Sequence, residues 1–386
     1  MSKRLFVFNP DCELAIANGS KYYMPPVNIV QMASDLAFLP AFMGERGDAV
    51  LVKRLPDKEF LQSVCIPLQL ECKALLETDT DQWTGMKGEA WGLSPAICHW
   101  FQQRQLGEDW RAEQKEWYSR KVAKQGLVQL LNVLPSIEKS IIPEICSSIE
   151  EIEEKFSGEE CLVKAPWSSS GKGILLLKGK PDAKEKEWLR GMLRRQGYLM
   201  LERKLDKVMD FAMEFRMEKG RTVFTGWSAF TTGSRGEYRG NYAGPQNRIE
   251  KKLQELIGGG QLNALKQSIL PVLDSLLPSY EGQLGVDMMI YRNEKEELYL
   301  HPCVEINLRY NMGIVALFLS RNYLADGVEG QFSILYYPSQ GEALREHFHL
   351  LADHPTVYKN NRILSGYLNL TPVDETTHFV ASLICY

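Results

Sequence analysis

The residues that could do chemistry form three groups between positions 161 and 309. A lysine, Lys164, ends a short apolar stretch that is typical of a strand, and a serine- and glycine-rich loop follows it. Acidic and amide side chains come much later in the chain. A cation, a loop that can wrap phosphate and hard oxygen ligands are what a protein needs to hold ATP with magnesium. The members of the last two groups are Ser168, Ser169, Ser170, Gly171, Lys172 and Gly173, and then Asp287, Glu305, Asn307 and Arg309.

The loop at 168–173 has no bulky side chains, so its backbone N–H groups could approach a polyphosphate closely. It lies between predicted strands at 161–164 and 173–178, which predicts a hairpin flap. A P-loop would need glycine at Pro166 and serine or threonine at Gly173, so that class of site is excluded. A protein-kinase loop would place its lysine after the glycines, whereas Lys164 comes before them. Taken alone, the loop fits a surface hairpin equally well.

The acidic group lies on two predicted strands, Gln283–Tyr291 and Leu298–Asn307, joined around Asn293. Strand residues alternate between faces, so Asp287 shares one face with Gly285 and Met289. In the second strand the apolar residues point one way and the polar residues point the other way: Glu305, Asn307 and Arg309. Two carboxylates and an amide oxygen suit magnesium, with water and phosphate completing the coordination. A solvent-exposed strand face is the alternative, although Asp and Asn are poor strand formers.

The surrounding elements predict an α/β chain. A short buried strand is expected at 4–8 and another at 49–53, with a helix near 27–38 and a second helix that begins at Ser94-Pro95. A charged linker at 108–116 precedes a helix at 120–132, and a capping box at Ser147–Glu151 starts the next helix. Longer alternating strands follow, then helices near 248–257 and 262–277, the second interrupted by Pro271. The last 55 or so residues contain mixed short elements without an assigned role.

This ordered set resembles the ATP-grasp superfamily over roughly residues 115–325. Val163 to Ile174 looks like the strand lysine and phosphate flap of that family, and Asp287 followed by Val304 to Arg309 looks like its metal-binding strand pair. The resemblance implies an α/β (α+β ATP-grasp) fold. Its expected parts are an N-terminal α/β domain at 1–112, two α+β subdomains at 113–200 and 201–330 that clasp the nucleotide, and a C-terminal extension at 331–386.

The resemblance also implies roles for individual residues. ATP would contact Lys121, Lys164, Glu202, Asp210 and the flap residues Ser168, Ser169, Ser170, Gly171 and Gly173. Asp287, Glu305 and Asn307 would hold Mg²⁺, two ions in all, and Arg309 and Lys164 would act in catalysis. Three alternatives stay open: Lys124 could replace Lys121, Glu214 could replace Asp210 as the ribose-contacting acid, and Arg309 could serve only a structural ion pair.

The substrate region is less defined. Asn9 to Glu13 follows the first strand, where α/β sheets present ligand-binding loops, and Asp11 is the candidate there. A loop between Gly233 and Gly244 carries Arg235 and Arg239, which could close over an anionic substrate. Two aromatic stretches, at 22–26 and 83–91, either wall a pocket or only pack.

Composition excludes several classes of protein. The 386 residues carry a net charge of −4 and contain no basic block, so no nucleic-acid partner is expected. No stretch approaches a membrane span, and the eight scattered cysteines have no zinc spacing, which predicts free thiols in the cytoplasm. His347 and His349 could chelate a metal on a strand, but a surface or interface pair is favoured. The oligomeric state stays open, with a homodimer as one alternative.

ATP-grasp proteins mostly activate a carboxylate with ATP for attack by an amine or a similar nucleophile. The resemblance therefore implies an ADP-forming ligase that joins small molecules. A phosphotransferase and a non-catalytic nucleotide-binding protein are the alternatives. Intact Lys164, Asp287, Glu305 and Asn307 argue against loss of the metal chemistry.

Overall fold

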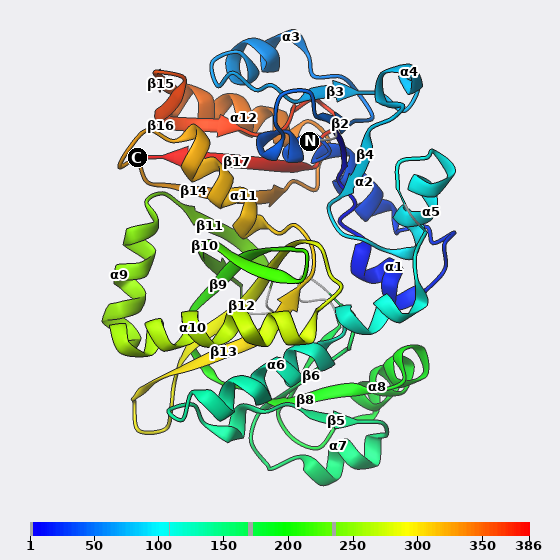
Figure 1. The fold of residues 1–386 in the computed structure, drawn as a ribbon, viewed down its shortest axis with the longest axis vertical. Helices are drawn as coiled ribbons and strands as arrows, with labels where there is room; N and C mark the ends of the chain where they lie inside the picture. The colour runs from blue at the N-terminus through cyan, green and yellow to red at the C-terminus, as the bar shows by residue number, and fades with distance from the viewer. Residues whose placement is uncertain (1–2, 108, 169–172, 234–236) are drawn as a thin grey trace.

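Three β-sheets organise the chain, and the computed structural model describes residues 3–107, 109–168, 173–233 and 237–386. A parallel sheet of four strands has the order β3-β2-β1-β4, and a second four-stranded sheet has the order β5-β8-β6-β7. The largest sheet has nine strands in the order β13-β12-β9-β10-β11-β14-β17-β16-β15. Figure 1 shows the large sheet in the middle of the molecule, between the two smaller ones.

The parallel sheet comes from the N-terminal part of the chain, as its short apolar runs predict. Ser94 begins α5 as expected, because its hydroxyl accepts a hydrogen bond from the Ile97 N–H at 3.4 Å. The elements here are β1 (Arg4–Val7), α1 (Cys12–Asn18), α2 (Val27–Asp35), η1 (Leu39–Met43), β2 (Ala49–Leu51), α3 (Lys58–Phe60), η2 (Leu61–Cys65), β3 (Lys73–Leu75), α4 (Thr80–Trp83), β4 (Lys87–Ala90) and α5 (Pro95–Gln103).

The second four-stranded sheet carries the predicted flap. Strands β6 and β7 pair antiparallel with Lys164 opposite Ile174, so the expected hairpin is confirmed, while its tip at 169–172 lies outside the described residues. Helices α7 and α8 pack on this sheet at the lower end of Figure 1. The elements are η3 (Ala112–Tyr118), α6 (Arg120–Val133), η4 (Lys139–Ile141), β5 (Glu144–Cys146), α7 (Ile149–Lys155), β6 (Cys161–Lys164), β7 (Ile174–Leu177), α8 (Ala183–Gln196) and β8 (Leu199–Arg203).

The nine-stranded sheet contains the predicted acidic hairpin, β12 and β13, which is confirmed by its antiparallel pairing. Four further strands from the last part of the chain continue the same sheet. The elements are β9 (Asp206–Glu218), β10 (Arg221–Thr232), β11 (Tyr238–Ala243), α9 (Gln246–Ile257), α10 (Gly259–Leu276), β12 (Gly282–Arg292), β13 (Leu298–Asn307), α11 (Met312–Phe318), η5 (Leu319–Tyr323), β14 (Gly330–Tyr336), α12 (Glu342–Asp353), β15 (Val357–Lys359), β16 (Arg362–Asn369) and β17 (Phe379–Cys385).

The two faces of the large sheet are covered differently. Phe211, Met213 and Phe215 point to one face and pack with α6, α9 and α10 in a single apolar core. On the other face α11 lies over β10 and β11, and the N-terminal region joins it in a second core. The part of this face that is left uncovered forms the floor of the cavity described below.

Three expectations are wrong. The segment from Tyr238 onward is strand β11 and not a loop, because it pairs with β10 and β14. Helix α10 runs through Pro271, since the residues around it are buried in the core and offset the lost hydrogen bond. His347 and His349 lie on helix α12 and not on a strand, and they are not a surface pair: His347 is buried with its ring 3.2 Å from the Tyr367 hydroxyl, whereas His349 is exposed.

In the described residues, none of the helices combines the length and the apolar character that crossing a bilayer requires.

Candidate functional site

A cavity of about 490 Å³ collects six of the site residues that the sequence singled out. Its floor is the uncovered face of the nine-stranded sheet, and its walls come from α2, α11, the β6–β7 hairpin and the loop after β1. The predicted residues that line it are Lys164, Asp210, Asp287, Glu305, Asn307 and Arg309, together with the alternative Glu214.

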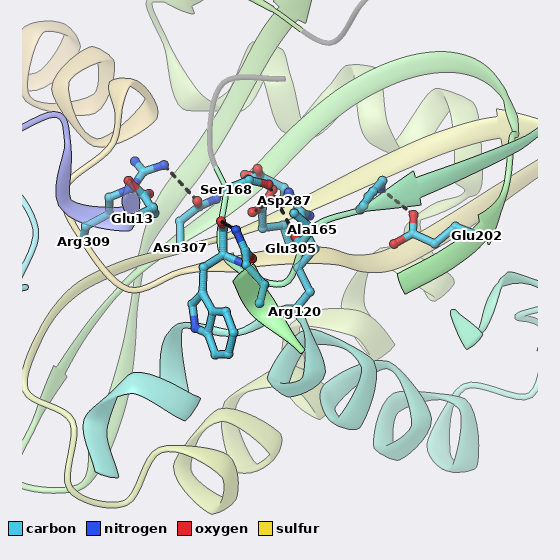
Figure 2. A network of polar contacts seen from close by, with 12 residues as sticks. Glu13, Arg120, Ala165, Ser168, Glu202, Asp287, Glu305, Asn307 and Arg309 are labelled. Atoms are coloured by element: carbon cyan, nitrogen blue, oxygen red, sulfur yellow. Dashed lines mark hydrogen bonds and ion pairs between the residues drawn. The ribbon is translucent and has the colours of Figure 1, made fainter. Parts of the chain in front are cut away.

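Strand pairing brings the three predicted metal ligands together. Asp287 is the direct cross-strand partner of Glu305, and Gly285 is the partner of Asn307. The Asn307 amide donates a hydrogen bond to Asp287 Oδ2 at 3.0 Å, and its oxygen accepts one from the Arg309 guanidinium at 3.0 Å. Figure 2 shows this cluster with Arg120 and Arg309 on its flanks.

The electrostatics of this cluster suit a divalent cation. Burial and the facing Glu305 carboxylate raise the pKa of Asp287 to about 7, more than Arg309 and Asn307 lower it. A cation between the two carboxylates would relieve that repulsion. Within the described residues no three Asp, Glu, His or Cys side chains form a complete metal cage. Hard oxygens with few protein ligands fit magnesium, which usually keeps water and phosphate in its coordination sphere.

Arg309 connects this cluster to the N-terminal part of the chain. Its guanidinium forms an ion pair with Glu13, which follows β1, and also donates to the Tyr310 carbonyl at 3.1 Å. Glycine at position 92 lets Cys12 and Arg309 pack closely against the backbone there, because a Cβ at Gly92 would lie 2.5 Å from Cys12 Sγ and 3.2 Å from Arg309 Cβ. The predicted structural ion pair therefore exists, and Arg309 still lines the cavity.

Lys164 is buried and its ammonium pairs with Glu202, the residue predicted to contact adenine. The two residues come from adjacent antiparallel strands, β6 and β8. A lysine on a buried strand face needs an anionic partner, and Glu202 supplies it in this structure. Lys164 lines the cavity, whereas Glu202 is outside its lining.

The sequence reasoning missed Arg120, which lies one position before the predicted Lys121. Arg120 is 7 % exposed, lines the cavity, forms an ion pair with Glu305 at 3.0 Å and donates to the Ala165 carbonyl at 3.1 Å. Lys121 instead places its ammonium 3.8 Å from the centre of the Tyr198 ring, outside the cavity lining. No sequence pattern separates Arg120 from Lys121, because tertiary packing decides which of the two adjacent cations is buried.

Two acidic side chains of β9 reach the cavity. Asp210 accepts hydrogen bonds from Lys207 at 2.6 Å and from Thr232 at 2.8 Å. Glu214 is 1 % exposed and accepts one from the Asn311 amide at 2.8 Å. Burial raises the pKa of Glu214 to about 8, more than the Asn311 hydrogen bond lowers it. Both remain candidates for contact with a ligand.

The flap is described only at its base. Ser168 is buried and its hydroxyl donates to the Ala165 carbonyl at 3.4 Å, while Gly173 has a φ of +79°. A Cβ at Gly173 would lie 2.9 Å from the Ser168 Cβ, so the base of the hairpin requires glycine. The predicted Ser169, Ser170 and Gly171, as well as Lys172, lie outside the described residues.

The predicted substrate residues are only partly brought to the site. Asp11 stands before helix α1 and outside the cavity lining, whereas Glu13 from the same segment lines it. Arg239 is exposed and pairs with Glu237 at 3.4 Å. Arg235 lies outside the described residues. In the segment after β1, therefore, Glu13 and not the predicted Asp11 lines the cavity.

Of the two aromatic stretches, only part of one lines the cavity. Trp91 lines the cavity, while Trp83 packs in an N-terminal core. Tyr22 and Met24 are 70 % and 85 % exposed and do not line the cavity. The residues of helix α2, which follows them in sequence, form that part of the cavity wall.

No family model and no curated protein matches the chain. Solved structures do. A biotin carboxylase–ATP-analogue complex from Campylobacter jejuni matches with a TM-score of 0.53 and 9 % identity, covering 100 % of this chain and 88 % of that one. N5-carboxyaminoimidazole ribonucleotide synthetase from Thermus thermophilus matches with a TM-score of 0.50 and 13 % identity, covering 99 % and 93 %.

A third match is the biotin carboxylase domain of 2-oxoglutarate carboxylase from Hydrogenobacter thermophilus, solved with MgADP, ADP and bicarbonate. Its TM-score is 0.50 at 12 % identity, with 100 % of this chain and 86 % of that chain covered. These likenesses span the whole chain, including the elements of 331–386, and they confirm the predicted architecture: the chain has the fold of the ATP-grasp superfamily.

Proposed function

We propose that this protein is an ADP-forming ligase that activates a carboxylate with MgATP for attack by an amine. The observation that carries the proposal is the convergence of Asp287, Glu305 and Asn307 with Lys164 and two arginines on one cavity. Three solved structures with the same fold are named as carboxylases or a synthetase, and two of those were solved with an adenine nucleotide or its analogue.

The net reaction would be carboxylate, ammonium form of the amine and ATP giving amide, ADP, inorganic phosphate and one proton. The terminal phosphoryl group moves to a carboxylate oxygen, and the amine nitrogen then forms the C–N bond as the C–O bond to phosphate breaks. Magnesium, when bound, would neutralise phosphate charge. Phosphoryl transfer needs alignment and charge neutralisation more than a protein nucleophile.

The chain's own residues would supply that alignment. Asp287, Glu305 and Asn307 would hold the metal, and Lys164 would face phosphate oxygens from the β6 side of the cavity. Arg309 and Arg120, already fixed by Glu13 and Glu305, are placed to stabilise developing negative charge without reorganising. Ser168 to Gly173 would cover the phosphates as a flap.

The test is ADP release with MgATP and pools of small carboxylates, with and without amines. Release that requires both co-substrates supports ligation. Release with a hydroxyl acceptor alone would indicate a phosphotransferase, and tight ATP binding without turnover in any mixture would indicate a binding protein.

A further inference from the structure

Arg120 joins two parts of the cavity wall, the end of β6 and strand β13, which belong to different sheets. Its backbone N–H donates to the Pro166 carbonyl at 3.1 Å and its Nε donates to the Ala165 carbonyl at 3.1 Å, so the start of α6 is fixed to the end of β6. Its terminal nitrogen Nη2 forms the ion pair with Glu305 at 3.0 Å, and Figure 2 shows Arg120 beside Ala165 and Glu305. The terminal part of the guanidinium is therefore what reaches the metal-binding strand pair.

The Arg120–Glu305 ion pair uses a carboxylate that is also a predicted metal ligand. Asp287 is the direct cross-strand partner of Glu305, so two carboxylates lie side by side on one face of the sheet. Of the described residues, Arg120 is the only lysine, arginine or histidine that forms an ion pair with either carboxylate. One paired positive charge thus serves two negative charges, whereas a divalent cation bound by both would match their charge.

A divalent cation and the guanidinium compete for the same carboxylate. Arg120 occupies Oε1 of Glu305. Magnesium binds carboxylate oxygens at about 2.0–2.1 Å, so it would lie close to the guanidinium. Arg120 is buried, and two positive charges at that separation repel each other more strongly in a buried site than in water. A cation at Glu305 therefore favours departure of the terminal nitrogens of Arg120 from this carboxylate.

Arg309 differs from Arg120 in what would hold it once a cation is bound. Arg309 has an ion pair with Glu13, which is outside the predicted metal ligands. Among the described residues, Glu305 is the only acidic side chain that forms an ion pair with Arg120. Without it, the Arg120 guanidinium would keep its hydrogen bond to the Ala165 carbonyl and would need a new anion for its terminal N–H groups.

A polyphosphate is the anion that fits this place. Lys164 is the residue before Ala165, lines the same cavity as Arg120 and is proposed to face phosphate oxygens. Because the Nε of Arg120 is held at Ala165, the two cations stand on the same wall of the cavity. Arginine recognises phosphate through two parallel N–H donors, which the terminal nitrogens of Arg120 could supply.

We propose that Arg120 neutralises Glu305 in the metal-free protein, leaves it when a divalent cation binds there, and then binds a phosphate group of the nucleotide. This inference rests on the nucleotide and metal part of the proposed function. It makes metal and nucleotide bind cooperatively, because both favour the arrangement in which Arg120 has left Glu305. The pairing that fixes Arg120 at Glu305 is that of the metal-free protein. The exchange precedes phosphoryl transfer, so the guanidinium is again fixed when charge develops.

Metal binding without nucleotide is the first test. Arg120→Gln keeps a nitrogen donor at the position of Nε, which can still bind the Ala165 carbonyl, and removes the charged end that reaches Glu305. The full chain is titrated with Mn²⁺, which prefers the same oxygen ligands as Mg²⁺, and free Mn²⁺ is measured by electron paramagnetic resonance. Arg120→Gln should bind Mn²⁺ at least roughly five-fold more tightly than the wild type. Equal or weaker binding would overturn the inference.

Two further variants locate that effect. Glu305→Gln should abolish the difference in Mn²⁺ affinity between the wild-type background and the Arg120→Gln background. Arg292→Gln is the matched control, because Arg292 ends β12 and is paired with Glu296 at 3.2 Å, and it should leave Mn²⁺ binding unchanged. An equal gain in Arg292→Gln, or a gain that persists together with Glu305→Gln, would refute competition at Glu305.

Nucleotide binding should change in the opposite direction. With Mg²⁺ present, Arg120→Gln should bind ADP roughly ten-fold more weakly than the wild type in calorimetric titrations, because a charged phosphate contact is lost. With EDTA in place of Mg²⁺ the two proteins should bind ADP about equally, since Arg120 of the wild type stays at Glu305. A purely structural role would weaken ADP binding by the same factor in both conditions, and that result would overturn the inference.

A second variant decides the matter if Arg120→Gln does not fold. Glu305→Gln frees Arg120 without any metal, so in EDTA it should bind ADP at least roughly five-fold more tightly than the wild type. Asp287→Asn removes the same negative charge from the neighbouring strand but leaves Arg120 at Glu305, and its gain should be smaller. Equal gains in the two variants would show that only repulsion between ADP and a carboxylate was removed, which would refute the exchange.

The ligation itself is judged separately, by ADP release that requires both a carboxylate and an amine. The expected changes in Mn²⁺ and ADP affinity without such release would uphold the exchange and refute ligation. Release that requires both co-substrates, together with weaker Mn²⁺ binding by Arg120→Gln, would uphold ligation and refute the exchange.

Discussion

One face of the nine-stranded sheet has a charged end and an apolar end. At β12, β13 and the residues just after them it presents charges, and two of these have a partner from far along the chain: Arg309 meets Glu13 across 296 positions, and Glu305 meets Arg120. At β14 and β17 the same face presents apolar side chains that merge with the core. The charged end depends on specific pairs, whereas the apolar end depends on shape, so substitutions should affect them differently.

The largest effect is expected at the charged end. Glu305→Gln should lower the rate of ADP formation by at least roughly 100-fold, because the side chain keeps its volume and loses its negative charge. Circular dichroism would show whether the fold survives the loss of the Arg120 ion pair. Glu297→Gln, just before the same strand, is the matched control and should keep full activity. Unchanged ADP formation by Glu305→Gln would exclude the metal role.

The buried Lys164–Glu202 pair allows binding and stability to be separated. Lys164→Met should weaken ATP binding by roughly 10- to 100-fold and lower the free energy of unfolding by about 3–5 kcal/mol, because Glu202 is left unpaired. Adding Glu202→Leu should recover most of the stability and none of the nucleotide affinity. Calorimetric titration and urea unfolding measure the two quantities. Recovery of both in the double variant would make Lys164 a structural residue only.

Glu214 predicts a pH dependence of stability. Its ordinary pKa of 4.5 applies to the unfolded chain, and the folded value is about 8, so between these values the unfolded state binds fewer protons. Stability should therefore be full below pH 4.5 and fall as pH rises to about 8, by about 1.4 kcal/mol per pH unit from this group. Glu214→Gln should flatten this part of the profile, as measured by urea unfolding at several pH values.

The raised pKa of Asp287 acts in the same direction, so the Glu214→Gln profile should keep a residual slope up to about pH 7. A variant profile parallel to that of the wild type would show that Glu214 is ionised throughout.

The smallest effects on stability are expected from replacing single glycines with alanine. Gly313→Ala should cost about 1–3 kcal/mol of stability and disturb the space beside Glu214, since the new Cβ would lie 2.2 Å from one carboxylate oxygen and 2.4 Å from Ser228 Oγ. Gly260→Ala, in helix α10 with nothing within 4 Å, should stabilise by about 0.5–1 kcal/mol. Thermal unfolding of both variants compares them. Equal changes in the unfolding temperature of the two variants would show that the residues around Gly313 move aside without a cost in stability.

The charged end could be predicted from sequence because its residues are anomalous where they stand. Asp287 and Asn307 interrupt apolar strands, so alternation assigns them to one face of their sheet, and Lys164 stands out because it ends another apolar strand. Arg120 could not be separated from Lys121 in the same way, because adjacent charges at a helix start differ only in which one tertiary packing buries.

The apolar end gave no such signal. Ile334 and Phe379 look like ordinary core residues in sequence, and only the assembled sheet shows that part of their surface faces a cavity. Likewise the strands of 331–386 are short and irregularly spaced, so their pairing with β11 depends on contacts that no local pattern encodes. The four predicted domain boundaries stay predictions.

The position of β17 has a consequence for how the protein matures. This strand, close to the end of the chain, is inserted between β14 and β16, two strands made earlier, as Figure 1 shows. A nascent chain that lacks β17 has unpaired edges on β14 and β16, so this part of the large sheet can close only after β17 is made, whereas Asp287 and Glu305 could meet much sooner.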